Sequence, residues 1–257
     1  MNKIEEQRKS FEDRSNDYYT KRQSENHLVL KDLIWNYFFH DKEYLNKNGM
    51  AVLEPMCGYG EGKKILERHL LCDFSYRGFD YSESLVKIAK EKNPELDIFV
   101  QDVTKYQEEN RYDLIIIIGS LHHVPDFVQL VVDKMYAALK PGGYFINFEP
   151  TQNNWFFRKV RQAIYRKNKT FDAQTERAFD LKEINRVYTN AGFQIIDQIY
   201  QGLSSFVLYY NPNAFPKLNV GNPKTVRRFF NIDKHFFKNW VGRRFSFSTT
   251  TLMRKPN

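Results

Sequence analysis

Short apolar runs of strand length recur along the first 150 residues, and each run ends at a polar residue or a glycine. The expected strands are residues 50–54, 76–80, 98–102, 112–119 and 143–149. Helix-like segments lie between them at residues 62–70, 82–92 and 127–139, with Ser82 and Asp126 as the expected N-caps of the last two. Strands that alternate with helices in this way predict an open parallel sheet with right-handed crossovers. The run YDLIIIIG is the most apolar, which favours a central strand covered on both faces.

The ends of these strands carry the candidate chemistry, because ligands of open α/β sheets bind in the crevice beyond the carboxyl ends of the strands. Four of the expected strands deliver an acid or a glycine there, namely Glu54, Asp80, Asp102 and Gly119. The turn after the first strand, VLEPMCGYGEG, contains alternating glycines, which let the backbone approach a ligand closely. The carboxylate of Glu54 beside this turn disfavours a pyrophosphate and favours a cationic ligand.

Structural alternatives exist for each of these residues. The glycines also suit a plain strand-to-helix turn, and Asp80 and Asp102 also suit helix caps. Cys57 is expected to be a small buried residue of the turn. Cys72 is the only other cysteine, so the chain has neither a disulfide framework nor zinc-type spacing, and no metal site is expected.

Taken in order, the segments VLEPMCGYGEG, YRGFDYSES, FVQDV, DLIIIIGSLHHVPD and LKPGGYFINFEP resemble the motifs of the class I S-adenosylmethionine-dependent methyltransferases. The resemblance covers about residues 45–200. It implies an α/β, Rossmann-like fold with a seven-stranded, mostly parallel sheet, helices on both faces and an antiparallel last strand. It also implies S-adenosyl-L-methionine as cofactor, S-adenosyl-L-homocysteine as product and methyl transfer as the activity.

The resemblance assigns a cofactor role to individual strand ends. Gly58 and Gly60 would approach the methionine part with Glu54 near its ammonium group, and Asp80 would accept from both ribose hydroxyls. Tyr81 would lie against the adenine, Asp102 would accept from its amino group, and Gly119 and Ser120 would border the methyl end. The full expected set is Glu54, Met56, Cys57, Gly58, Gly60, Asp80, Tyr81, Asp102, Val103, Gly119 and Ser120. Many family members have glycine or a small residue where this chain has Met56.

Two adjacent histidines, His122 and His123, follow the fourth strand, where the methyl donor is expected to end. A histidine can act as a general base near neutral pH. Adjacent residues at a strand end point to opposite sides, so at most one is expected to face the substrate, and His123 is slightly preferred. In many relatives a histidine here holds the loop together, and methyl transfer can proceed without a strong base because orientation supplies much of the acceleration.

The remaining segments distinguish this chain from the common core. Residues 1–44 are expected to form an N-terminal helical cap over the cofactor, with Tyr18, Tyr19 or His27 near the site or simply packed on the sheet. The core would comprise residues 45–200 and 242–257, including a helix opened by a capping box at Asp180 and strands at 193–200 and 244–254. Insertions at 151–179 and 202–241, both rich in aromatic residues, would form an acceptor-binding lid or pocket.

Charge is distributed unevenly along the chain. Residues 151–257 hold 19 Lys and Arg against 6 Asp and Glu, whereas residues 1–150 hold 20 against 25. The basic excess therefore lies in the part expected to bind the acceptor, and it suits an anionic acceptor or contact with an anionic membrane surface. The sequence contains no apolar run of membrane-spanning length and no secretory signal, so a cytoplasmic protein, with peripheral membrane contact left open, is expected.

Three functions fit these observations. The first is methylation, at oxygen, of a small-molecule or a lipid-linked or glycan-linked acceptor. The second is an RNA methyltransferase that uses the basic aromatic C-terminal region, although no base-methylating tetrad follows the fourth strand and no separate RNA-binding module is present. The third is an inactive homologue that binds the cofactor, which the intact cofactor motifs disfavour. Oligomeric state is left open.

Overall fold

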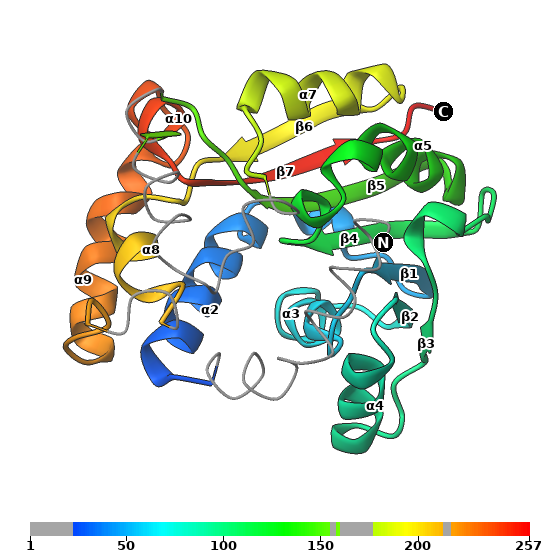
Figure 1. The fold of residues 1–257 in the computed structure, drawn as a ribbon, viewed down its shortest axis with the longest axis horizontal. Helices are drawn as coiled ribbons and strands as arrows, with labels where there is room; N and C mark the ends of the chain where they lie inside the picture. Colours follow the sequence, from blue (N-terminus) through cyan, green and yellow to red (C-terminus); the bar gives the residue numbers. More distant parts are fainter. Residues whose placement is uncertain (1–22, 155–157, 160–176, 213–216) are drawn as a thin grey trace.

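The computed structural model describes residues 23–154, 158–159, 177–212 and 217–257, and its centre is a seven-stranded sheet (Figure 1). The strands lie in the order β3-β2-β1-β4-β5-β7-β6. Every neighbouring pair is parallel except those of β7, which runs antiparallel to both β5 and β6. The strands are β1 Met50–Pro55, β2 Phe74–Asp80, β3 Ile98–Val100, β4 Tyr112–Ile118, β5 Leu139–Pro150, β6 Gln194–Ile199 and β7 Ser248–Arg254. The expected fold class is confirmed.

Alternating side chains of β4 bury both faces of this sheet. Leu114 and Ile116 belong to a core shared with helices α2 (Glu25–Phe39) and α3 (Glu61–His69). Ile115 and Ile117 belong to a second core shared with α5 (Val128–Ala138) and α7 (Leu181–Asn190) on the opposite face. Each buried aliphatic side chain contributes about 1.5–3 kcal/mol. The central, doubly covered strand predicted from YDLIIIIG is therefore β4.

Three residues, Ser82, Asp126 and Asp180, were predicted to cap the N-termini of helices. Ser82 caps α4 (Glu83–Lys92) as expected, because its hydroxyl accepts from the Leu85 N–H. The expectation for Asp126 is wrong, since Pro125–Phe127 forms a 3-10 turn and α5 begins only at Val128. Asp180 is the N-cap residue of α7, but its carboxylate makes no capping bond and instead accepts from Arg158 at 2.8 and 2.9 Å.

In its described residues the second insertion contains helices α8 (Ser204–Tyr209) and α9 (Pro223–Asp233), and α10 (Trp240–Phe245) begins at its end. Helices α8 and α9 pack against α2 beside the sheet (Figure 1). The insertion extends the first core, because Tyr210 stacks on Phe148 of β5 at 5.3 Å between ring centroids. Its buried aromatic side chains are Phe206, Tyr209, Tyr210, Phe230 and Phe237. Its role as an acceptor lid stays a prediction.

The N-terminal segment also packs as part of the core. His27 on α2 is fully buried, and its Nδ1 lies 2.7 Å from the Tyr210 carbonyl oxygen. This agrees with the packing alternative for His27, whereas Tyr18 and Tyr19 lie outside the described residues. Of the helices in the described part of the chain, none has both the length and the apolar character needed to span a bilayer.

Both insertions begin and end at one hydrogen-bonded junction at the carboxyl end of β5. The Gln152 N–H donates to the Phe179 carbonyl oxygen at 2.9 Å, which joins the two ends of the first insertion. The Thr151 N–H donates to Phe247 at 2.9 Å, and the Phe247 N–H donates to Gly202 at 2.8 Å. The aromatic and basic run NWFFRKVRQAIYRKNK lies almost entirely outside the described residues.

Candidate active site

The glycine turn after β1 has an unusual backbone. Met56, Gly58 and Gly60 have φ angles of 54°, 55° and 76°, in the left-handed region that favours glycine. Met56 therefore adopts a backbone conformation that glycine adopts more readily. A Cβ added at Gly58 would meet no atom within 4 Å, whereas one at Gly60 would lie 2.9 Å from Ile98 Cδ1. Gly58 therefore presents open backbone, and Gly60 is required by close packing.

Glu54 at the end of β1 holds this turn against the first turn of α3. Its two carboxylate oxygens accept the Gly62 N–H at 2.9 and 3.0 Å, and Oε2 also accepts from the Tyr76 hydroxyl at 2.5 Å. The side chain is buried, and burial raises the pKa of Glu54 to about 8 against the opposing effect of these hydrogen bonds. Its predicted proximity to the cofactor's ammonium group stays a prediction beside this structural role.

Asp80 at the end of β2 links the glycine turn to the start of α4. Its Oδ2 accepts the Gly58 N–H at 2.8 Å and its Oδ1 accepts the Ser82 N–H at 3.0 Å. A carboxylate oxygen can accept more than one hydrogen bond, so both oxygens retain the chemistry that a ribose diol requires. Tyr81 follows directly and is partly buried. Asp80 and Gly58, which are 22 residues apart, are thus brought together as the sequence predicted.

Asp102 adopts the cap geometry that the sequence left open. Its Oδ1 accepts from the Thr104 backbone N–H at 2.9 Å and from the Thr104 hydroxyl at 2.7 Å, at the start of a 3-10 turn. Lys105 Nζ lies 3.4 Å from the other oxygen. The Val103 side chain is buried in the second core, so only its backbone can face a ligand. The predicted adenine contact of Asp102 stays a prediction.

The end of β4 approaches the glycine turn. Gly119 has a φ of 61°, and a Cβ there would meet only Phe148 Cδ1 at 3.9 Å. Ser120 donates its hydroxyl to the Met56 carbonyl oxygen at 3.2 Å, which ties the ends of β1 and β4 together. Cys57 is buried in the turn, as expected, and burial raises the pKa of its thiol. At the ends of the adjacent strands β1 and β4, Gly58 and Gly119 therefore leave their backbone accessible to a ligand.

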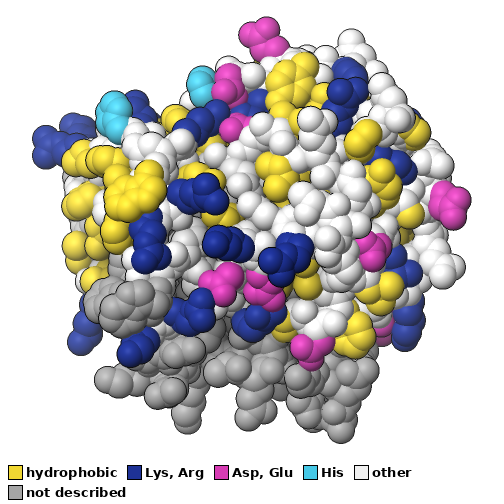
Figure 2. Space-filling view, turned by 90° about the horizontal axis from the view of Figure 1, so that it is seen from above, with side chains coloured by type: hydrophobic (Ala, Val, Ile, Leu, Met, Phe, Trp, Pro, Cys, Tyr) yellow, Lys and Arg dark blue, Asp and Glu magenta, His cyan; other side chains and the backbone are white. Residues whose placement is uncertain are grey.

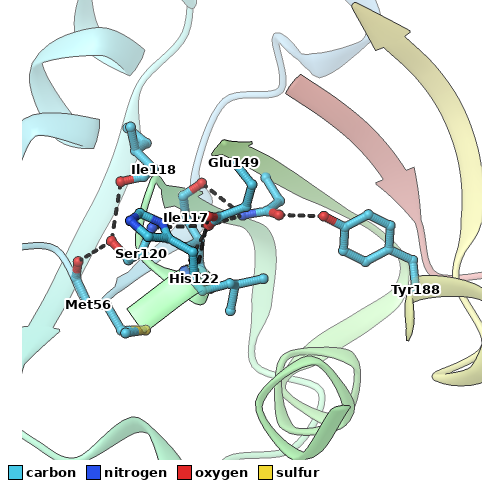
Figure 3. A network of polar contacts seen from close by, with 9 residues as sticks. Met56, Ile117, Ile118, Ser120, His122, Glu149 and Tyr188 are labelled. Atoms are coloured by element: carbon cyan, nitrogen blue, oxygen red, sulfur yellow. Dashed lines mark hydrogen bonds and ion pairs between the residues drawn. The ribbon is translucent and has the colours of Figure 1, made fainter. Parts of the chain in front are cut away.

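The loop after β4 is organised by Glu149, a buried carboxylate at the end of β5 (Figure 3). Glu149 Oε1 accepts the Ser120 and Leu121 N–H groups at 3.0 and 2.7 Å. Its Oε2 lies 2.9 Å from His122 Nδ1 and accepts the His122 N–H at 3.3 Å. A carboxylate paired with Nδ1 selects the tautomer in which Nδ1 carries the proton, which leaves Nε2 as the basic nitrogen.

A second polar layer holds Glu149 in place. The Asn147 amide donates to Glu149 Oε1 at 3.3 Å and to the Ile117 carbonyl oxygen at 3.2 Å, and it accepts from the Tyr188 hydroxyl at 2.5 Å (Figure 3). Burial raises the pKa of Glu149 to about 7, while the surrounding N–H donors and His123 oppose the shift. The network therefore extends from α7 through β5 to the loop after β4.

The two histidines lie side by side in the loop after β4. Their rings lie 4.0 Å apart between centroids, and both belong to the 3-10 turn Leu121–His123. His122 pairs with Glu149 through Nδ1, and its carbonyl oxygen accepts the Arg177 N–H at 3.2 Å. The end of the first insertion therefore contacts the histidine turn directly, at His122.

Glu149 is the site residue that sequence reasoning missed. It appeared only as the last residue of an expected strand, in GYFINFE. A signal was available, because strands that follow one another through a helix are commonly neighbours, and an acid at the end of β5 then lies beside the end of β4. Within the described ranges, no three His, Cys, Asp or Glu side chains are grouped so that they could hold a metal ion.

Comparisons with known proteins indicate a methyltransferase. The family model described as "Methyltransferase domain" matches residues 52–143, from β1 to the start of β5. The demethylmenaquinone methyltransferase of Oceanobacillus iheyensis is 26% identical over 171 residues, which cover 58% of this chain and 71% of the relative. The enzyme of the same name from Listeria welshimeri is 24% identical over 175 residues, covering 60% and 74%.

Solved structures share the fold at low sequence identity. A chain of the complex between the Haloferax volcanii Trm112 methyltransferase activator and a putative methyltransferase superposes with a TM-score of 0.63 at 14% identity, covering 96% of this chain and 98% of that chain. A putative sarcosine dimethylglycine methyltransferase from Galdieria sulphuraria gives 0.61 at 15% identity, covering 88% and 86%. These likenesses concern the fold alone.

Proposed function

The chain belongs to the class I S-adenosylmethionine-dependent methyltransferases, and on that premise we propose that it methylates an oxygen of a small-molecule, lipid-linked or glycan-linked acceptor by direct SN2 transfer. The observation that supports this proposal is the His122–Glu149 pair, an oriented imidazole in the loop that follows Gly119. A base is useful for a hydroxyl acceptor, because the alkoxide or phenolate is the stronger nucleophile.

The residues at the strand ends fit S-adenosyl-L-methionine. Gly58 and Gly119 leave room for a ligand to contact the backbone, and the Asp80 carboxylate lies at the end of the neighbouring strand. In this proposal Asp80 binds the ribose hydroxyls and Gly58 borders the methionine part. When bound, the cofactor supplies an electrophilic methyl group on a sulfonium, and S-adenosyl-L-homocysteine is the product.

On the acceptor side, His122 is the proposed base. Its Nε2 takes the proton of the acceptor hydroxyl while the acceptor oxygen forms the bond to the methyl carbon, and the carbon–sulfur bond breaks with its electron pair on sulfur. Glu149 holds the ring and stabilises the imidazolium that results. The sequence slightly preferred His123, and we assign the role to His122 because its Nδ1 lies 2.9 Å from Glu149.

The relatives narrow the class of acceptor that we propose. The two relatives described above are named demethylmenaquinone methyltransferases, which supports a quinone-type acceptor whose reduced form carries ring hydroxyls. A ring hydroxyl that loses its proton becomes nucleophilic at oxygen and at the adjacent ring carbon. The same base therefore serves either product, and the position of the new methyl group must be measured.

The donor half is tested first. Calorimetry should detect binding of S-adenosyl-L-methionine and of S-adenosyl-L-homocysteine to the purified protein, with binding weakened at least tenfold by Asp80→Asn. Asn retains one oxygen for the Gly58 or Ser82 N–H, so the fold should survive, and circular dichroism checks this. Asp97→Asn, at an exposed acid before β3, is the matched control and should bind as wild type.

The acceptor half is tested with a methyl-labelled donor and reduced demethylmenaquinone in detergent as the probe, with a catechol as a second probe. Label in a methyl ether supports O-methylation, and label on a ring carbon overturns that part of the proposal while retaining the base. Wild-type protein that binds neither cofactor nor product contradicts the whole proposal.

A further inference from the structure

The surface of residues 217–247, which we call the basic aromatic surface, combines positive charge with exposed apolar side chains. It carries eight Lys and Arg and a single acid, Asp233. Asp233 is buried, where it accepts from the Ser204 hydroxyl and from Ser205, so it does not offset the exposed positive charge. The cations are Lys217, Lys224, Arg227, Arg228, Lys234, Lys238, Arg243 and Arg244.

Most of these cations have no acidic partner. Lys238 pairs with Asp41 and Asp197, and Arg244 donates to the Asn153 carbonyl oxygen. Within the described part of the chain, the remaining cations on α9, α10 and the turn between them form no ion pair, and those residues are Lys224, Arg227, Arg228, Lys234 and Arg243. Such a surface attracts anions at short and intermediate range.

Large apolar side chains project from the same segment. Trp240, the first residue of α10, is 69% exposed, and it packs edge-to-face on Phe245 at 6.0 Å between ring centroids. Ile232 at the end of α9 is 60% exposed, and Val220 before α9 is 62% exposed. On the side where α10 lies in Figure 1, Figure 2 shows exposed hydrophobic side chains flanked by Lys and Arg.

We propose that the basic aromatic surface docks the enzyme on an anionic lipid bilayer, with Trp240 inserted at the headgroup level. Tryptophan favours the interface between headgroups and acyl chains, and Lys and Arg near an anionic leaflet add attraction. Aliphatic side chains such as Ile232 and Val220 suit lipid better than RNA, since bases stack on aromatic rings. A second copy of this chain suits the surface poorly, because a two-fold interface would bring like charges together.

The test uses vesicle co-sedimentation of the whole protein at low salt. Wild type should bind vesicles of phosphatidylcholine with phosphatidylglycerol, bind pure phosphatidylcholine at least tenfold more weakly, and lose binding as salt increases. Trp240→Ala should weaken binding at least about tenfold, and Arg227→Ala about fivefold. Calorimetry with S-adenosyl-L-methionine should show each variant binding cofactor as wild type, which separates this result from the proposed function.

Two control substitutions replace side chains that are also exposed but lie outside the basic aromatic surface. Leu71→Ala removes a side chain that is 87% exposed between α3 and β2, and Lys87→Ala removes one that is 78% exposed on α4. Both should bind vesicles as wild type. The proposal is overturned by absent binding to anionic vesicles, by unchanged binding of Trp240→Ala, or by Trp240-dependent binding of a single-stranded RNA oligonucleotide in preference to vesicles. Trp240-dependent dimerisation without lipid also overturns it.

Discussion

The replacement Glu149→Gln tests whether His122 acts as a general base or only holds the loop after β4 together. Gln keeps one oxygen for the Ser120 and Leu121 N–H groups, which now lie 3.0 and 2.7 Å from Oε1. Its amide nitrogen would face His122, where Oε2 now lies 2.9 Å from Nδ1. Two donors cannot share that contact, so the imidazole should shift its proton from Nδ1 to Nε2. The nitrogen proposed to receive the acceptor proton would then already carry one.

The size of the effect follows from these contacts. A positioned general base contributes about 100- to 10,000-fold, so kcat should fall at least about 100-fold while KM for the cofactor changes little. Loss of one hydrogen bond to a charged group should cost about 1.5–3 kcal/mol of the free energy of unfolding. Nitrogen NMR of the histidine rings should show His122 as the Nδ1–H tautomer in wild type and as the Nε2–H tautomer in the variant.

Two comparisons make this prediction falsifiable. Glu183→Gln removes a carboxylate on α7 that pairs with Arg177, and it should leave kcat near the wild-type value. In a His122→Ala background, Glu149→Gln should cost little further activity, because the two residues act as one unit. A folded Glu149→Gln protein with wild-type kcat, or an equal loss with and without His122, would refute the reasoning.

Two further outcomes are expected. Gly62→Ala should lower the free energy of unfolding by about 1–3 kcal/mol in urea titrations, because the new Cβ would lie 2.6 Å from the Glu54 carboxylate; a gain of the size expected from helix propensity alone would contradict this. Burial raises the pKa values of Glu54 and Glu149 to about 8 and about 7, above about 4.3 for an unfolded Glu. The folded state then retains protons that the unfolded state has lost, so the free energy of unfolding should fall as pH rises from about 5 to 8, by up to about 1.4 kcal/mol per unit for each carboxyl. Activity should rise through about pH 7 as Glu149 ionises. If the free energy of unfolding of the double variant Glu54→Gln/Glu149→Gln does not change with pH over this range, these two carboxyl groups cause the pH dependence of the wild type.

Much of the donor half could be predicted from the sequence, because local patterns specify it. The apolar runs locate the strands, and the order of their terminal residues brings Gly58, Asp80 and Gly119 to one edge of the sheet. Cap positions were less reliable. Asp126 precedes α5 as a cap would, but Pro125 starts a separate 3-10 turn whose geometry depends on the loop packed beside it.

The second insertion and the loop after β4 could not be predicted in the same way, because their organisation depends on contacts between distant segments. The aromatic residues of the second insertion suggested a pocket, whereas Phe206, Tyr209 and Phe230 are buried against α2 and β5. His122 pairs with Glu149 because β4 and β5 are adjacent strands, and no local sequence pattern predicts which strands are adjacent.

The junction at the carboxyl end of β5 has a consequence for engineering. Hydrogen bonds of Thr151, Gln152, Gly202 and Phe247 hold the ends of both insertions in one place. A segment of different length or sequence could therefore be grafted between residues 152 and 179 with its ends already positioned, whereas a graft between 202 and 247 would also have to replace the core side chains of Phe206, Tyr209 and Phe230. A graft in the first insertion would leave the sheet and the glycine turn unaltered, so the chain offers a scaffold in which this segment is exchanged as a cassette.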